Sequence, residues 1–136
     1  MIQRGAYSPT TDLIAAAQTV TGSWVDLGLL TDTRGFNTIA VWFNLTINNT
    51  TGFRLRCIAR HTETSSDDYL LPIATVSNAN VQIQDEYFEL VDNADQKLVV
   101  SCDIFNVIPW CQFQISAGTV GATGATVDTA KVSRGY

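Results

Sequence analysis

The chain has 136 residues and a formal net charge of −5, and only 15% of its residues are charged. This length fits one domain that buries a hydrophobic core without disulfide or metal support. Nucleic-acid-binding domains are typically basic, so the acidic balance argues against a nucleic-acid partner. About a quarter of the residues in ordinary soluble domains are charged, so we expect another subunit to cover part of this neutral surface.

The N-terminal segment, residues 1–12, mixes Gly, Pro, Ser and Thr, and it is predicted to be an extended arm. It lacks the apolar run of a secretory signal peptide. No stretch of the chain approaches the roughly 18 apolar residues of a membrane helix. We therefore expect synthesis in a reducing cytoplasm and no membrane contact. The remainder, residues 13–136, is predicted to form a single domain.

Short elements are predicted after the arm. Alanine-rich residues 13–18 are too few for a stable helix and are interpreted as an irregular strand. Residues 24–28 form a short strand bounded by glycines, and residues 31–35 form a turn. These elements lead into the stretch on which we expect the core to be built.

Two alternating segments within residues 37–61 dominate the chain. In an extended strand, apolar residues at every second position share one face. They are Ile39, Val41, Phe43, Leu45 and Ile47 in the first segment, and Phe53, Leu55, Cys57 and Ala59 in the second. Turn-forming residues at 48–52 separate the segments. We therefore predict an antiparallel hairpin.

The second half continues the strand pattern after an exposed loop at 62–68. The apolar alternation changes phase at Asp85 and Glu86, which predicts a β-bulge there. Further strands are predicted at 69–73, 81–90, 98–104, 110–115 and 126–132. About eight strands without a convincing helix predict an all-β, antiparallel two-sheet β-sandwich. A jelly-roll-like topology is the leading interpretation, and an immunoglobulin-like topology stays open.

No catalytic signature occurs in the sequence, so we predict a non-enzymatic protein without cofactor, catalytic or metal residues. His61, the only histidine, has acidic and serine neighbours but no nucleophile pattern around it. The three cysteines lack metal-ligand spacing, and they are interpreted as reduced core residues. A disulfide between Cys102 and Cys111 stays an alternative.

Four residues are predicted to form an interface. Arg54, Arg56 and Arg60 share one face of one strand, where like charges repel unless carboxylates face them. Those carboxylates belong either to this chain, at residues 85–89, or to a partner subunit, where the planar guanidinium of arginine is favoured. Trp42 occupies the polar face of its strand, which makes it a candidate interface anchor.

The aromatic residues leave a second function open. Aromatic side chains in alternating strands are usually core or interface residues. They could also line a sugar-binding platform, assisted by calcium at acidic turns such as 92–95, although no EF-hand spacing is present. The residues concerned are Trp24, Trp42, Trp110, Tyr69, Tyr87 and Phe88. A carbohydrate-binding β-sandwich module is therefore the alternative function.

Several stretches spread over most of the chain resemble small all-β virion proteins of tailed phages, which decorate or project from capsids. They are 22–28 (GSWVDLG), 34–36 (RGF), 85–87 (DEY), 93–97 (NADQK), 112–114 (QFQ) and 117–119 (AGT). The resemblance implies a jelly-roll-like fold and assembly as a homotrimer or other closed oligomer. It also implies contact with the major capsid protein or another virion protein, and hence a place in the virion. None of these stretches has an assigned chemical role, so the resemblance implies no site residues.

Overall fold

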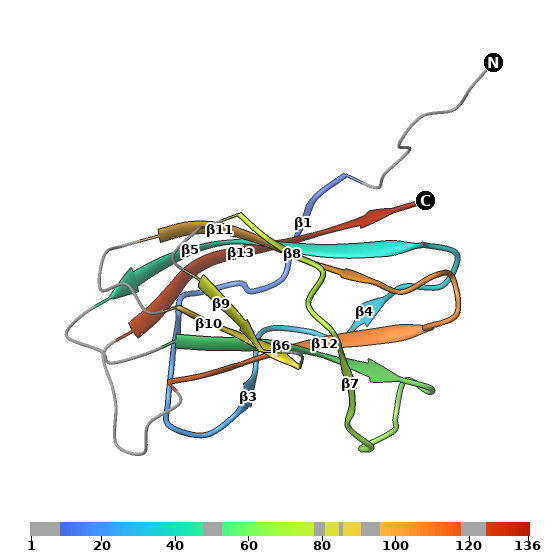
Figure 1. Ribbon diagram of the computed structural model, residues 1–136, viewed down its shortest axis with the longest axis horizontal. Coiled ribbons are helices and arrows are strands. Elements are labelled where there is room, and N and C mark those ends of the chain that lie inside the picture. Colours follow the sequence, from blue (N-terminus) through green and yellow to red (C-terminus); the bar gives the residue numbers. More distant parts are fainter. Residues whose placement is uncertain (1–8, 48–52, 78–80, 85, 91–95, 118–124) are drawn as a thin grey trace.

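The computed structural model describes residues 9–47, 53–77, 81–84, 86–90, 96–117 and 125–136. These residues form β-strands and no helix, so the described part of the chain has no helical segment able to cross a membrane. The strands form two antiparallel sheets (Figure 1). We call them the β5 sheet and the β6 sheet after their central strands.

The β5 sheet has the strand order β1–β13–β5–β11–β8, and β2 pairs with another part of β13. Its longest ladder joins β5 to β13, with one shift of register between Val127 and Thr129. The strands are β1 (Thr11–Asp12), β2 (Gln18–Thr19), β5 (Thr38–Ile47), β8 (Thr75–Val76), β11 (Gln96–Asp103) and β13 (Ala125–Gly135).

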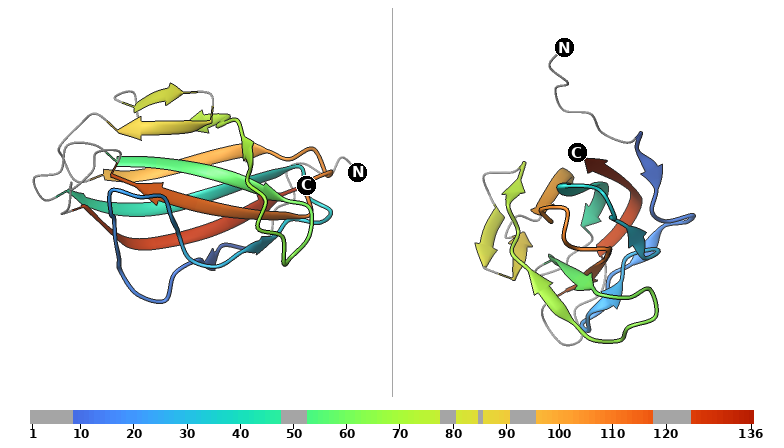
Figure 2. Two further views of the ribbon diagram at one scale, coloured as in Figure 1. Left: turned by 90° about the horizontal axis from the view of Figure 1, so that it is seen from below. Right: turned by 90° about the vertical axis from the view of Figure 1, so that its right-hand side faces the viewer.

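The β6 sheet has the strand order β3–β12–β6–β10–β9, while β4 pairs with β12 and β7 pairs with β6. Figure 2 shows the β9–β10 hairpin (yellow) at the margin of the sandwich. The strands are β3 (Val25–Asp26), β4 (Thr31–Asp32), β6 (Phe53–Arg60), β7 (Tyr69–Leu71), β9 (Val81–Gln84), β10 (Tyr87–Leu90) and β12 (Trp110–Ser116).

Four strand pairs are nested along the chain: β5 with β13, β6 with β12, β8 with β11, and β9 with β10. The first strand of this series pairs with the last, and each following strand pairs with the next one inward, as in a jelly roll. The predicted all-β, two-sheet, jelly-roll-like sandwich of about eight main strands is confirmed. The nested pairing answers the question of topology that the sequence left open.

The predicted hairpin over residues 37–61 is wrong, because β5 and β6 lie in different sheets and do not pair. Their apolar faces meet across the core instead. Phe43 of β5 packs against Phe53 of β6 with ring centroids 5.7 Å apart. Alternation shows which side chains of a strand face the core. Two consecutive strands have the same alternating sequence whether they pair within one sheet or lie in two sheets that face each other. The predicted turn at 48–52 lies outside the described residues.

The β-bulge predicted at Asp85 and Glu86 is also wrong. β9 and β10 pair antiparallel, with Tyr87 opposite Gln84, so the chain reverses between two separate strands. The change of phase in the sequence therefore marks the end of one strand and the start of the next. Asp85 itself lies outside the described residues.

The core is formed by the inner faces of both sheets. Three phenylalanines lie at its centre, with Phe88 of β10 placed 6.3 Å from Phe43 and 5.9 Å from Phe53 between ring centroids. All three are at most 2% exposed. Full burial of one such side chain contributes about 1.5–3 kcal/mol, so this cluster joins the two sheets strongly.

Candidate contact surfaces

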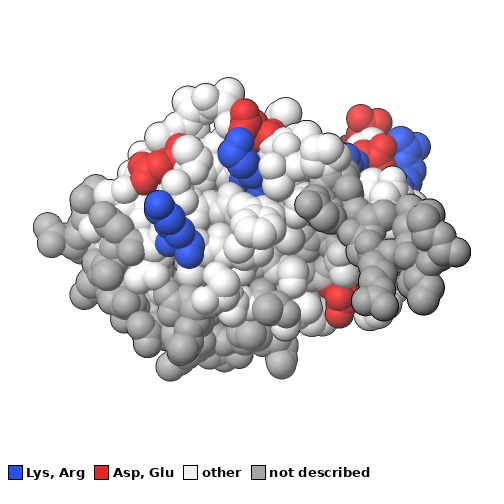
Figure 3. All heavy atoms as spheres, turned by 90° about the horizontal axis from the view of Figure 1, so that it is seen from above, with Lys and Arg blue, Asp and Glu red and all other residues white. Residues whose placement is uncertain are grey.

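The outer face of the β5 sheet presents the large aromatic side chain of Trp42. Trp42 lies opposite Val99 of β11 on one side and Lys131 of β13 on the other. It is 47% exposed, and its Nε1 donates a hydrogen bond of 2.9 Å to Oγ of Ser133. Figure 3 shows that uncharged residues cover most of this face and that charged groups on it are scattered. The predicted anchor is therefore accessible and held in one orientation.

A hollow of about 670 Å³ lies beside this tryptophan. It is lined by Pro9, Thr10, Trp42 and Ser133. The chain reaches this place because Thr11 of β1 pairs with Val132 of β13. Residues 1–8, which belong to the predicted arm and lie outside the described part of the chain, are thus attached to the sandwich next to Trp42.

The three candidate arginines lie on the outer face of β6, and two of them form ion pairs within the chain. Nε of Arg54 donates to Oε2 of Glu89 at 2.9 Å, and the guanidinium lies 5.0 Å from the centre of the Tyr87 ring. Arg60 has a side chain only 12% exposed and pairs with Asp68 at 3.3 Å. Glu89 was among the internal partners that the sequence left open.

Arg56 is held by neutral groups. Its Nε and Nη2 donate to Oε1 of Gln114 at 2.9 and 2.7 Å, and its guanidinium lies 4.4 Å from the centre of the Trp24 ring. Partial burial lowers the pKa of Arg56, while the charges of Asp68 and Glu86 act in the opposite direction. The aromatic stacking was not anticipated from the sequence. An intersubunit contact through Arg54, Arg56 and Arg60 stays a prediction.

The outward residues of β12 are enclosed by their neighbours in the β6 sheet. Gln112 and Gln114 are only 5% and 8% exposed. Nε2 of Gln112 donates to the carbonyl oxygen of Gly28 at 3.3 Å, and Nε2 of Gln114 donates to Oδ1 of Asp26 at 2.8 Å. Residues 25–28 run beside β12 at the edge of this sheet, and the Trp24 ring stacks on Arg56 of β6. We call this arrangement of residues 24–28 around the two glutamines the cover.

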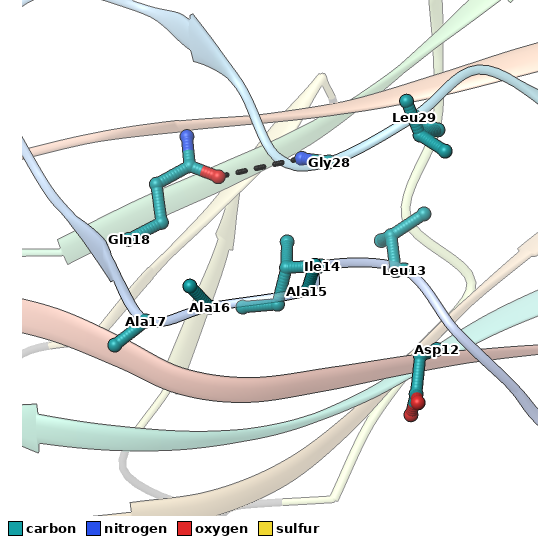
Figure 4. A pocket seen from close by; sticks show the side chains of 9 residues that line it. All are labelled: Asp12, Leu13, Ile14, Ala15, Ala16, Ala17, Gln18, Gly28 and Leu29. Atoms are coloured by element: carbon teal, nitrogen blue, oxygen red, sulfur yellow. Dashed lines mark hydrogen bonds between the residues drawn. The ribbon is translucent and has the colours of Figure 1, made fainter.

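A second hollow, of about 470 Å³, lies where residues 12–18 pass Gly28 and Leu29 (Figure 4). The backbone N of Gly28 donates to Oε1 of Gln18 at 3.4 Å. Gly28 has a φ of +67°, and a Cβ added there would collide with the carbonyl oxygen of Leu13. Glycine is therefore required for this close approach. The sequence predicted an irregular strand here but no hollow.

The residues with titratable or ligating side chains are mostly dispersed. Among the residues that the structure describes, no three His, Cys, Asp or Glu side chains gather closely enough to hold a metal ion. His61 is exposed and packs edge-on against Tyr69, with ring centroids 5.9 Å apart. The acidic turn at 92–95, named as a calcium candidate, lies outside the described residues.

The three cysteines meet in the core as free, fully buried thiols. Hydrogen bonding with Cys102 and Cys111, together with burial, raises the pKa of Cys57 well above its usual value. A thiol with a raised pKa is a poor nucleophile, because the thiolate is the reactive form. The interpretation as reduced core residues is confirmed, and the alternative disulfide between Cys102 and Cys111 is wrong.

Sequence reasoning missed the connection between β11 and β12, residues 104–109. Phe105 and Val107 are 70% and 73% exposed although both are apolar. A signal was available, because the run from Asn106 to Pro109 places two apolar residues in a turn, where small and polar residues are usual. These exposed apolar side chains make the turn a candidate contact surface.

Comparison with known proteins identifies the fold. No protein-family model matches the sequence, and no curated protein matches it. The crystal structure of the SPBc2 prophage-derived protein YomS aligns with 100% of this chain and 98% of its own chain, with a TM-score of 0.58 and 12% identity. A carbohydrate-binding module, CBM6cm-2 from Cellvibrio mixtus lichenase 5A in complex with cellotriose, aligns with 91% of this chain and 95% of its own, with a TM-score of 0.45 and 9% identity. At this level of identity, the similarity to YomS shows a shared fold.

Proposed function

We propose that this chain is a non-enzymatic structural protein of a bacteriophage particle. It self-associates as a homotrimer and binds the major capsid protein or another virion protein, as a capsid decoration or auxiliary head protein. It works through shape and repeated contacts, and it needs no cofactor. Its place is the virion, after synthesis in the host cytoplasm.

The similarity to a prophage-derived protein carries this proposal. It extends over 100% of this chain and 98% of YomS, so the two proteins share the complete sandwich rather than a single motif. A shared fold does not determine function, because one fold serves many functions. The surface of this chain therefore has to supply the remaining support.

The Trp42 face of the β5 sheet supplies that support. A half-exposed tryptophan on a surface with few charges is a typical centre of a protein interface. The hydrogen bond to Ser133 fixes the indole before any partner arrives, which lowers the entropy cost of association. The low share of charged residues, 15%, agrees with a chain whose surface is partly covered in an assembly.

Replacing Trp42 with Ala tests self-association. We expect light scattering coupled to size-exclusion chromatography to give the native chain three times its mass of 14.8 kDa. Interface anchors contribute about 2 kcal/mol or more, so the variant should associate more than tenfold more weakly. Because Trp42 is exposed, the thermal unfolding of the variant should stay close to that of the native chain.

Leu29→Ala is the matched control. Leu29 is 75% exposed but lies away from the Trp42 face, beside Gly28, so its loss should leave the mass unchanged. A native chain that stays monomeric at micromolar concentration contradicts the proposal, as does a Trp42 variant that associates like the native chain. Mass spectrometry of purified phage particles tests the virion location separately.

A carbohydrate-binding module is the second candidate. The observation in its favour is the hollow beside Trp42, where the indole lies with Thr10 and Ser133, two residues that carry hydroxyl groups. Ligand sites commonly combine an aromatic wall with a few polar groups. Glycan-array binding that is lost in the Trp42→Ala variant would favour this candidate. A melting temperature that rises with calcium would do the same, because a ligand bound only by the folded state stabilises it.

A further inference from the structure

One end of the sandwich carries a third hollow, which we call the end hollow. It lies between the end of β6 with His61, β7 and residues 107–109 of the connection before β12, and its volume is about 310 Å³. Its apolar walls are Ala59, Tyr69, Leu71, Val107, Ile108 and Pro109. Tyr69 and Val107 are 56% and 73% exposed, so the end hollow opens to the surface.

The connection that forms one wall is firmly held although it presents apolar side chains to water. Backbone hydrogen bonds tie it to the segment before β5 and to itself. They run from N of Ile104 to O of Asn37 (2.8 Å), N of Phe105 to O of Asn37 (3.0 Å), N of Asn106 to O of Phe36 (2.9 Å), N of Val107 to O of Ile104 (3.0 Å) and N of Thr33 to O of Pro109 (2.9 Å). The wall is therefore formed before a ligand binds, which lowers the cost of binding.

The same connection contains backbone strain. Phe105 and Asn106 have φ values of 51° and 55°, in the left-handed region that phenylalanine rarely adopts. Strained residues of this kind concentrate at functional sites. A connection that is both strained and apolar at the surface is costly for the isolated chain, and an occupant that covers it offsets this cost.

The charge beside the end hollow points to the chemistry of that occupant. Nη1 of Arg60 donates to the carbonyl oxygens of Ser65 and Asp67, at 3.0 Å each, and fixes the loop. Arg60 and His61 line the end hollow, and Arg60 pairs with Asp68 at 3.3 Å. The loop that continues from His61, which we call the rim, carries Glu63 and Asp67 besides Asp68. The rim is acidic on balance, and it fits an apolar segment that carries a basic residue.

We propose that the end hollow binds residues 1–8 of a second copy of this chain. This segment has four apolar residues, Met1, Ile2, Ala6 and Tyr7, one basic residue, Arg4, and no acidic residue. Its composition matches the apolar walls and the acidic rim. Eight residues of any chain reach at most about 29 Å when fully extended.

The place where the segment is attached favours exchange between copies. Residue 9 lies beside Trp42 on the β5 sheet, whereas the end hollow is built on β6 and β7 of the other sheet. A contact from one surface to a different surface is head-to-tail, and such contacts form a ring when the rotation between neighbouring copies closes. This inference rests on the self-association proposed above and names one of its contacts.

Two full-length variants test the proposal when they are mixed. Tyr7→Asp damages the segment and leaves the end hollow intact, while Val107→Asp damages the end hollow and leaves the segment intact. We expect each variant alone to associate at least tenfold more weakly than the native chain in light scattering. An equimolar mixture should form a one-to-one complex, because the intact segment of one variant meets the intact end hollow of the other.

Leu29→Asp is the matched control, since it places the same charge at an equally exposed apolar position away from the end hollow. Thermal unfolding of each variant checks that the fold is retained. If both variants assemble like the native chain, this proposal is overturned while self-association stands. A mixture that shows no complex indicates binding within one copy and also overturns it. A native chain that is itself monomeric overturns the proposed assembly together with this contact.

Discussion

The outer faces of the two sheets differ although both come from alternating strands. On the β5 sheet, the outward residues Trp42 and Lys131 reach solvent. On the β6 sheet, the outward residues Gln112 and Gln114 are buried by the cover, residues 24–28 that run along the free edge of β12. Alternation in a strand determines which side chains face the core, but a distant segment decides whether the other face stays open.

The covered face keeps its polar residues because each of them has a hydrogen-bond partner. Gln114 accepts from Arg56 and donates to Asp26, so one amide joins three strands. Among the described residues, no buried side-chain nitrogen or oxygen atom lacks a partner. Burying an unpaired polar group costs about 1–3 kcal/mol, so this network is a condition for the cover to form. The open face has no such requirement, because its outward side chains reach solvent.

Removing the close approach at Gly28 should break the cover, and we expect the largest effect there. In Gly28→Ala the new Cβ collides with the carbonyl oxygen of Leu13, and the φ of +67° is strained for alanine. The free energy of unfolding should fall by at least about 2 kcal/mol. Chemical denaturation measures it. Gly35→Ala is the control, because its φ is +87° but a Cβ there meets nothing within 4 Å. A loss equal to that of Gly35→Ala would refute the close approach as the cause.

The glutamine network should be next in size. Gln114→Ala removes the acceptor of Arg56 and the donor to Asp26, so we expect a loss of about 1–3 kcal/mol in urea unfolding. Asn44→Ala makes a similar change on the open face of β5, where the loss should stay within about 0.5 kcal/mol. Equal losses at the two positions would mean that the two faces do not differ energetically.

The smallest effect is expected at the margin of the cover, where Asp32 of β4 pairs with Arg34. The side-chain hydrogen bond from Arg34 lowers the pKa of Asp32 to about 2. The folded-state pKa lies below the unfolded value of about 3.9, so the ion pair stabilises the fold above that pH and its contribution is lost as the pH falls through about 2. Asp32→Asn should therefore lower the unfolding midpoint slightly at pH 7, and the difference should disappear near pH 2. Because both side chains are exposed, a large difference at pH 7 would be unexpected.

The sequence was sufficient for the fold class because long strands such as β5 and β11 alternate between inward apolar and outward residues. The inward residues of β11, such as Leu98 and Val100, are buried as predicted. The pairing of β5 with β6 was predicted incorrectly, because nearness in sequence favoured a hairpin over two facing sheets. Strand partners that are far apart in sequence leave no mark in a single sequence.

The candidate sites were predictable only in part, because the pattern of one strand shows which way its side chains point but not which distant residues they contact. Trp42 was predicted to be exposed because it interrupts a polar face, and the structure places it there. The stacking of Arg56 on Trp24 was missed because the two residues come from distant segments. The wall at 104–109 was missed because its exposure depends on left-handed backbone at Phe105, which no residue preference predicts.

The nested pairing has a consequence for how the chain folds during synthesis. Thr38 at the start of β5 pairs with Asp103 of β11 and with Gly135 of β13, so both partners of β5 are made long after it. Until they leave the ribosome, β5 has two open edges and an apolar face, which readily pair with other chains. The β5 sheet therefore closes late through contacts distant in sequence, a slow step. Recruitment of a chaperone to the nascent chain would be most useful in the interval between the synthesis of β5 and that of β13.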